Sequence, residues 1–299
     1  REAAKVSDIA TAMSVEGLNG TLSVFDEDLQ ELRPHPGQAD SAYNIRTVAA
    51  DSPILAAALD GFKANDVQDA YSIRCTPQVA GGFRDTLTYV TQVANRELAA
   101  ANDNPVVAKD GRVASNGNFH GAPVAYVLDF LAIVVADLAS MSERRTDRFL
   151  DPARNRGLNA FLAGDPGVDS GHMIAQYAQA GIVAELKRNA VPASADSIPS
   201  SAMQEDHVSL GWSAGRKLRR SIDGLQRVLA VEILTAARAL DMRHGEPSAG
   251  TGAAVSTLRK LVDGPGTDRY LSPEIEHSVQ LVKGGDYVEA VEAVVGQLR

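Results

Sequence analysis

The sequence predicts an all-α fold, a bundle of long helices with one small β-hairpin. Apolar residues recur at spacings of three, four and seven along most of the chain, which is typical of helices with one buried face. Aromatic residues make up only 5% of the chain and alanine is abundant, a composition that favours close-packed helices over a β-sandwich. A run without proline from 201 to about 243 exceeds the usual globular helix, which indicates a bundle or an oligomer core.

The first predicted helix starts with the chain, where Ala3, Val6, Ile9, Ala10 and Met13 recur at helical spacing. No Ser, Thr, Asp or Asn precedes them as an N-cap, so we expect further sequence upstream. A trimmed, frayed terminus is the alternative, because caps are only preferences. The next stretch, residues 19–52, is expected to be rich in loops and to be followed by a short helix over 53–62.

The rest of the chain alternates predicted helices with turns. A helix is expected over 76–101, and a hairpin follows it with Asp110 and Gly111 as a two-residue turn. A glycine-rich loop at 116–121 then opens the next helix. Further helices are expected over 122–145, 170–189, 201–243, 253–262, 273–282 and 287–298, and together they predict one interleaved helical domain over 1–299.

Composition disfavours several kinds of partner. The net charge is −9 and no basic block occurs, so nucleic acid and anionic membrane surfaces are poor candidates. Cys75 is the only cysteine, which excludes an internal disulfide framework and favours the reducing cytoplasm. The longest apolar run, 124–136, is interrupted by Asp129 and is too short to span a bilayer.

Polar and ionisable residues crowd the segment SSAMQEDHVSLGW, residues 200–212. Ser201 and Gln204 match a capping box, which would place Glu205 in the first turn of a helix, where the helix dipole stabilises carboxylates. A metal site is disfavoured, because Glu205 and His207 are two residues apart and would point to different faces of that helix. The sequence contains no HExxH and no Cys/His ligand spacing.

A hydrolase is the alternative suggested by Gly211-Trp-Ser213-Ala-Gly215, which matches the G-x-S-x-G nucleophile elbow. That motif requires a strand, a strained turn and then a helix. Here an apolar helical pattern runs through the motif, and no β-branched run precedes it. We therefore expect the glycines to permit close helix packing and Ser213 not to be a nucleophile.

Two further clusters suit ligand binding. Gln68, Tyr71 and Arg74 are three residues apart in turn, so a helix would place all three on one face. Arginine can grip a carboxylate with two parallel hydrogen bonds, and tyrosine can transfer a proton; a surface salt bridge beside a half-buried tyrosine is the alternative. Gly117 lets the backbone approach a ligand, and Phe119 offers a flat apolar wall, although a helix-entry loop would look similar.

Together these segments resemble one family. The blocks QDAYSIRCTPQV, NDNPVV, SNGNFHGAPVA, SERRTDR, DSGHMIAQY and SIPSSAMQEDHVS occur in the order seen in the aromatic amino-acid ammonia-lyases, most closely the histidine ammonia-lyases of actinobacteria. The resemblance covers essentially the whole chain. It implies an all-α, fumarase/aspartase-like architecture and a homotetramer whose active sites combine residues from three subunits. It also implies elimination of ammonia from an α-amino acid, aided by 4-methylideneimidazol-5-one (MIO), a group formed from Ala-Ser-Gly.

The resemblance assigns roles to five residues of this chain. Arg74 matches the residue that binds the substrate carboxylate, and Tyr71 and Gln68 match residues beside the MIO electrophile and the substrate amine. Phe119 matches a residue that packs against MIO. Glu205 matches the residue that reaches the substrate ring and helps to specify imidazole, so the implied reaction converts L-histidine to urocanate and ammonia.

The sequence departs from the family pattern in two ways. Met203 stands where many histidine lyases carry Asn. The chain contains no Ala-Ser-Gly, and the catalytic-base tyrosine and a substrate-selecting histidine lie upstream in family members. We therefore interpret the chain as the C-terminal part of a lyase, inactive alone. The alternatives are a tyrosine or phenylalanine lyase or a tyrosine aminomutase of the same family, and, from another class, a non-catalytic helical scaffold.

Overall fold

The structure, a computed structural model, describes residues 1–60 and 68–299 and confirms the predicted all-α class. Its only sheet within the described residues is an antiparallel pair of two-residue strands. The helices are α1 (Glu2–Gly17), α2 (Glu27–Glu31), α3 (Pro36–Val48), α4 (Pro53–Asp60), α5 (Tyr71–Arg74), α6 (Thr76–Leu98), α7 (Ala122–Leu150), α8 (Met173–Asn189), α9 (Gly211–Asp241), α10 (Ala249–Arg259), α11 (Ser272–Gly284) and α12 (Asp286–Val295), the 3-10 turns are η1 (Ser23–Phe25), η2 (Ala160–Leu162) and η3 (Ser201–Met203), and the strands are β1 (Val106–Val107) and β2 (Val113–Ala114).

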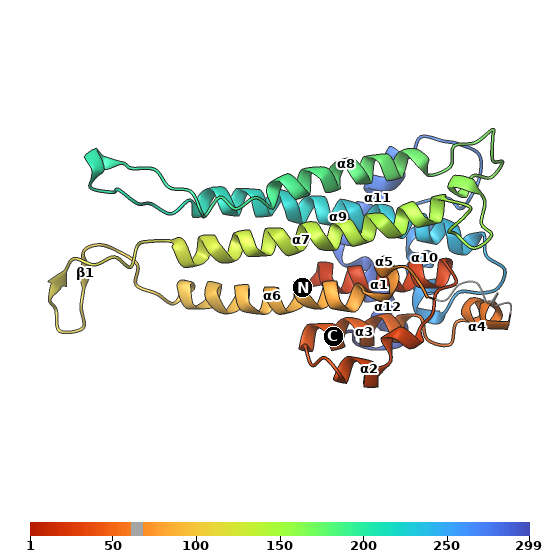
Figure 1. Ribbon diagram of the computed structural model, residues 1–299, viewed down its shortest axis with the longest axis horizontal. Coiled ribbons are helices and arrows are strands. Elements are labelled where there is room, and N and C mark those ends of the chain that lie inside the picture. Colours follow the sequence, from red (N-terminus) through yellow and green to blue (C-terminus); the bar gives the residue numbers. More distant parts are fainter. Residues whose placement is uncertain (61–67) are drawn as a thin grey trace.

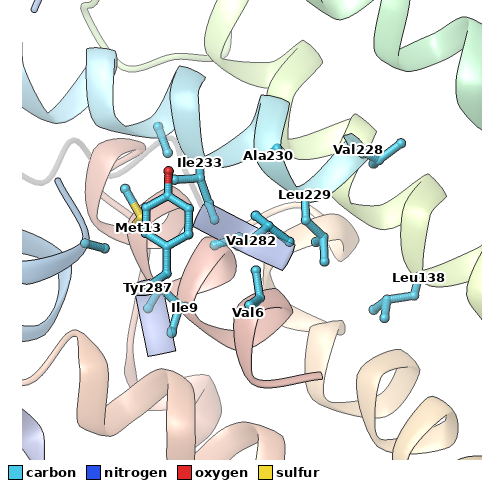
Figure 2. Packing of buried hydrophobic residues seen from close by; sticks show 14 of the residues in the cluster. Val6, Ile9, Met13, Leu138, Val228, Leu229, Ala230, Ile233, Val282 and Tyr287 are labelled. Carbon is cyan, nitrogen blue, oxygen red and sulfur yellow. The ribbon is translucent and has the colours of Figure 1, made fainter. Parts of the chain in front are cut away.

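Helix α1 lies in the core, and every residue from Val6 to Gly17 is buried. A helix that is covered on all sides must carry small or apolar residues at most positions, as α1 does. Figure 2 shows Ile9 and Met13 of this helix packed with Ile233 of α9 and Tyr287 of α12. Segments from both ends of the chain therefore form one hydrophobic core.

Two buried acids on α1 accept hydrogen bonds from elements distant in sequence. Asp8 and Glu16 are both inaccessible to solvent, where an unpaired carboxylate would be strongly destabilising. Each is surrounded by donors, so the two acids fix α3 and α10 against α1. The donors are Ser41, Asn44 and Arg84 for Asp8, and Ser52, Thr251 and the backbone N–H of Ser248 for Glu16.

The four longest helices, α6 to α9, lie side by side as a bundle (Figure 1). Helix α7 packs most extensively against α9 and also contacts α6 and α8. The ends of these helices extend past the rest of the protein as an arm. We call the two segments beyond those helix ends the arm tips: residues 99–121, which include the hairpin, and residues 190–210.

Helix α7 is the one described helix long and apolar enough to cross a membrane by length and composition. The sequence-based estimate of its apolar run was too short, because the helix continues for 29 residues to Leu150. Half of its most apolar window is buried inside the protein. Asp129 within that window pairs with Lys217 of α9 at 2.7 Å, which indicates packing in a protein bundle.

Two local predictions differ from the structure, and a third is only partly tested. The stretch expected to be rich in loops, 19–52, contains α2 and the 13-residue helix α3. The hairpin has a three-residue loop, because Ala108 N–H bonds to the Arg112 carbonyl at 2.9 Å and Gly111 takes the left-handed φ of 81°. The predicted helix over 53–62 is α4, and its expected end at Phe62 lies outside the described residues.

Candidate functional site

Tyr71 and Arg74 lie together on α5, as the sequence predicted. The guanidinium carbon of Arg74 is 4.5 Å from the centre of the Tyr71 ring, and Arg74 Nε donates to the carbonyl of Asp69 at 2.9 Å. The Tyr71 side chain is 69% exposed. Among the residues that the structure describes, the Tyr71 hydroxyl and the two terminal nitrogens of Arg74 have no hydrogen-bond partner. The two nitrogens therefore present an open fork that fits a carboxylate.

Gln68 does not share a helical face with these two residues, because α5 begins only at Tyr71 and Gln68 lies in a bend before it. That prediction was wrong about the local structure, although Gln68 is exposed and lies three residues before Tyr71. The bend is fixed by its neighbour: Asp69 accepts a hydrogen bond from Thr21 N–H at 2.7 Å and pairs with Arg156 at 3.0 Å. The segment that carries Gln68 is therefore anchored to the core by a buried acid.

Phe119 and Glu205 lie on the two arm tips, both exposed to solvent. The tips touch one another through His120 and His207, whose rings stack with 5.3 Å between their centres. Nε2 of His120 lies 3.2 Å from Nδ1 of His207, so one nitrogen of the pair donates to the other. This contact joins the loop of Phe119 to the loop of Glu205.

The predicted helix start at Ser201 is wrong, because α9 begins at Gly211. Ser201, Ala202 and Met203 have φ angles of 51°, 55° and 72°, in the left-handed region that a right-handed helix excludes. The N–H of Gln204 bonds to the Ser201 carbonyl at 3.2 Å and not to its hydroxyl, so no capping box forms. The crowded polar segment is a turn at the end of the arm.

Glu205 is held in that turn by Ser200. The two residues exchange backbone hydrogen bonds of 2.9 and 3.3 Å, and the Ser200 hydroxyl donates to Glu205 Oε2 at 2.6 Å. Hydrogen bonds from the Ser200 and Ser201 hydroxyls lower the pKa of Glu205 below its usual value. The carboxylate therefore stays ionised at neutral pH without help from a helix dipole.

Helix α5, which carries Tyr71 and Arg74, lies far along the bundle from the arm tips, one of which carries Glu205 (Figure 1). Helix α5 packs near Arg145 of α7, whereas the arm tips meet near Ala122, where α7 begins. At a rise of 1.5 Å per residue, these two points on α7 are roughly 35 Å apart. One protomer therefore does not bring the predicted site residues around a common cavity.

A buried ion pair beneath α5 was not predicted from the sequence. Arg145 of α7 and Glu232 of α9 are both inaccessible to solvent, and their closest nitrogen and oxygen are 2.5 Å apart. Arg145 also donates to the carbonyl of Ser72 in α5 at 3.1 Å. No sequence signal beyond the SERRTDR block marked this arginine, because burial of a charged side chain is invisible in the local pattern.

Two other candidate chemistries have no support in the geometry. Ser213 lies within the first turn of α9 and follows an irregular segment, so the strand that a nucleophile elbow requires is absent there. Within residues 1–60 and 68–299, no three His, Cys, Asp or Glu side chains gather as a set of metal ligands.

Known proteins of similar sequence belong to one enzyme family. The family profile described as "Aromatic amino acid lyase" matches residues 1–260. The chain is 58% identical over 296 residues to a histidine ammonia-lyase of Streptomyces avermitilis, covering 98% of this chain and 57% of that protein. It is 45% identical over 300 residues to a histidine ammonia-lyase of Sorangium cellulosum, covering 98% of this chain and 58% of that protein. The chain thus spans a little over half the length of these relatives.

Solved structures share the fold. A tyrosine aminomutase from Streptomyces globisporus superposes with a TM-score of 0.93 at 35% identity, over 100% of this chain and 60% of that chain. A histidine ammonia-lyase from Trypanosoma cruzi gives a TM-score of 0.89 at 37% identity, over 98% of this chain and 55% of that chain. The helical arrangement is therefore that of lyase and aminomutase structures.

Proposed function

We infer the function from one premise: this chain belongs to the aromatic amino acid lyase family. We propose that it forms the C-terminal part of a histidine ammonia-lyase, a cytoplasmic enzyme that converts L-histidine to urocanate and ammonia. Relatives with that name are 58% identical over nearly the whole chain. The observation that carries the proposal is the open guanidinium fork of Arg74 beside the exposed Tyr71.

Arg74 is proposed to bind the carboxylate of the amino acid. Its Nε is held by the Asp69 carbonyl, so the side chain is oriented while the two terminal nitrogens stay available. A planar guanidinium matches a carboxylate with two parallel hydrogen bonds, which would fix the orientation of the substrate as well as its position. Tyr71 and Gln68 would then lie on the side of the substrate amine.

Glu205 is proposed to recognise the imidazole ring. An ionised carboxylate accepts a hydrogen bond from a ring N–H, whereas a phenyl ring would leave it without a partner. The Ser200 hydroxyl donates to one oxygen of Glu205, and the exposed carboxylate keeps lone pairs that can accept from the ring. This arrangement favours histidine over phenylalanine as the substrate.

The separation of Arg74 from Glu205 supports a composite site built from several protomers. Both ends of the arm are exposed, and the outer faces of α6 and α7 carry large apolar side chains that a monomer would leave in water. Burial of these faces against further copies would bring the arm tips of one protomer towards α5 of another. We propose the homotetramer of the family as that assembly. The exposed side chains are Tyr89, Tyr126, Phe130 and Ile133.

The MIO group would come from a segment upstream of this chain, because no Ala-Ser-Gly occurs here. The residues present fit such a group in chemistry: Phe119 is 57% exposed and could pack flat against its ring, and the exposed Tyr71 of another protomer could lie next to it. Bound MIO supplies an electrophile that makes the weakly acidic β-proton removable. This chain's own residues would bind the carboxylate, orient the ring and support the group.

Substitution of Arg74 in the full-length protein tests the proposal. Ammonia and urocanate release from L-histidine is measured for wild type, Arg74→Ala and Arg74→Lys, with the exposed Arg33→Ala as the control. Loss of an aligned charge-assisted pair costs about 2–5 kcal/mol, so Arg74→Ala should lower kcat/KM at least roughly thirtyfold, mainly through KM. Arg74→Lys keeps the charge without the fork and should recover only part of the loss. Unchanged constants for Arg74→Ala would contradict the assignment.

The second candidate is a tyrosine or phenylalanine lyase or an aminomutase, favoured by the structural similarity to a tyrosine aminomutase. The amino acid consumed by the full-length enzyme decides between them. A further expectation is that the 299-residue chain alone releases no ammonia, because the electrophile and the catalytic base would be absent. A purified full-length protein that consumes no aromatic amino acid would instead favour the helical scaffold.

A further inference from the structure

We propose that Arg145 is a positioning residue for the proposed substrate site. Its guanidinium links the bundle core to the four-residue helix that carries Tyr71 and Arg74, and so fixes where that pair stands. This inference rests on the proposed function for its effect on substrate binding. Its structural part, the restraint of α5, stands on the geometry alone.

The buried carboxylate of Glu232 holds one edge of the guanidinium. Arg145 Nε and Nη2 donate to the two oxygens of Glu232 at 2.5 and 2.9 Å. The Ser14 hydroxyl of α1 donates to the same carboxylate at 2.7 Å. Three helices, α1, α7 and α9, therefore fix the orientation of Arg145, and both charges are inaccessible to solvent.

The remaining edge of the guanidinium faces α5. Nη1 of Arg145 donates to the Ser72 carbonyl at 3.1 Å and lies 3.2 Å from the Thr76 hydroxyl oxygen. The Thr76 hydroxyl itself donates to the Ser72 carbonyl at 3.0 Å. The carbonyl in the middle of α5 thus receives two hydrogen bonds from side chains outside it.

Helix α5 needs such support, because a single turn is unstable by itself. The N–H groups of Ile73, Arg74 and Cys75 donate to the carbonyls of Ala70 and Tyr71, which closes this one turn. Ile73 is buried under the turn, whereas Tyr71 points into solvent. Without Arg145, the Ser72 carbonyl would keep only the Thr76 hydroxyl, and the turn that presents the Arg74 fork would lose its link to the core.

The test compares Arg145→Met with Arg238→Met in the full-length protein. Arg238 is the matched control: it is also a buried arginine, but it donates to the carbonyls of Leu162 and Gly266, away from α5. Both substitutions should lower Tm. Hydrogen exchange of the amides at 73–75, followed by mass spectrometry, should accelerate at least roughly tenfold only for Arg145→Met, because local opening controls that exchange.

Steady-state kinetics distinguish a positioning role from a purely structural one, because loss of a purely structural residue would not specifically raise KM. KM for the amino acid should rise at least roughly tenfold in Arg145→Met with a smaller change in kcat, because a misplacement of about 1 Å is enough to misalign a bound group. Arg145→Lys should recover part of the KM change. Thr76→Val removes the hydroxyl that accepts from Arg145 and donates to the Ser72 carbonyl, so it should fold and raise KM about twofold. Arg145→Lys replaces Arg145→Met if that variant is insoluble.

The outcomes separate the two proposals. Normal exchange at 73–75 and an unchanged KM in folded Arg145→Met, or in Arg145→Lys where that variant replaces it, would overturn the positioning role. An equal KM rise in Arg238→Met would also overturn it, because the effect would then follow from general instability. If wild type releases no ammonia from any aromatic amino acid while exchange at 73–75 still accelerates, the proposed function fails and the restraint of α5 by Arg145 stands.

Discussion

Two adjacent glycines on α6, Gly81 and Gly82, should respond oppositely to substitution by alanine. A Cβ on Gly81 would lie 2.4 Å from the backbone nitrogen and 2.5 Å from the Cα of Gln38 on α3. A Cβ on Gly82 would meet no atom within 4 Å. Helix α3 can accommodate the first only by moving, because backbone atoms cannot rotate away as a flexible side chain does.

The expected magnitudes follow from helix propensity and overpacking. Alanine in place of glycine in an exposed helix interior stabilises by about 1 kcal/mol, which Gly82→Ala should gain in full. Overpacking costs about 1–3 kcal/mol, and a clash with backbone belongs at the upper end, so Gly81→Ala should destabilise by a net of about 2 kcal/mol. Thermal unfolding at matched protein concentration should separate the two variants by roughly 6–12 °C. A Tm for Gly81→Ala equal to or above that of Gly82→Ala would refute the close contact of α3 with α6.

Two other substitutions probe a buried histidine and the ring pocket. Burial, with the nearby Arg238, lowers the pKa of His172 from 6.5 to about 3, so the folded state binds this proton less readily than the unfolded state does. The free energy of unfolding should therefore fall as the pH drops from 6.5 towards 3, by up to about 1.4 kcal/mol per pH unit. His172→Gln should flatten the difference in Tm between pH 7 and pH 5, and an unchanged slope would contradict this. Glu205→Gln should lower kcat/KM for L-histidine at least roughly tenfold and shrink the preference over L-phenylalanine, whereas an unchanged ratio would remove Glu205 from the ring pocket.

The elements that the sequence located are those with apolar periodicity over several turns. Helices α1, α6, α7 and α9 show this pattern and were predicted with ends shifted by a few residues, or by ten in the case of α9. Helix α3 was missed, because its buried face carries Gln38, Ser41 and Asn44, which bond to other buried polar groups. A polar face that is satisfied inside the protein looks like a loop in the sequence.

The candidate site was predictable in its residue types and not in its geometry. Tyr71 and Arg74 are three residues apart, and one turn of helix places them together as expected. The Ser201 capping box was misleading, because Ser-x-x-Gln also occurs in a turn with left-handed residues, and local pattern does not distinguish the two. The positions of Arg145 and Glu232 beneath α5 depend on the packing of α7 against α9, which no local segment encodes.

The separation of the two halves of the proposed site permits a test of its composite nature. Helix α5, which carries Arg74, and the arm tip that carries Glu205 lie beside two points on α7 that are roughly 35 Å apart in one protomer, a span that no side-chain movement can close. If a site takes Arg74 from one chain and Glu205 from another, each single variant impairs every site of its own homo-oligomer. Mixed oligomers of Arg74→Ala and Glu205→Gln would then contain some sites in which both residues are intact.

Random assembly from equal amounts of the two variants fixes the size of that recovery. Each site draws its two residues independently from different chains, so about a quarter of the sites should carry both native residues. Co-refolded or co-expressed variants should therefore recover up to about a quarter of wild-type histidine turnover, while mixtures of the separately assembled variants recover none. If both residues served the same site from the same chain, every site would keep one defect. Oligomers shown by mass spectrometry to contain both variants would recover no activity only if one chain supplied both residues or if one residue lay outside the site. Because the length of α7 forbids the first arrangement, such a result would remove Arg74 or Glu205 from the site.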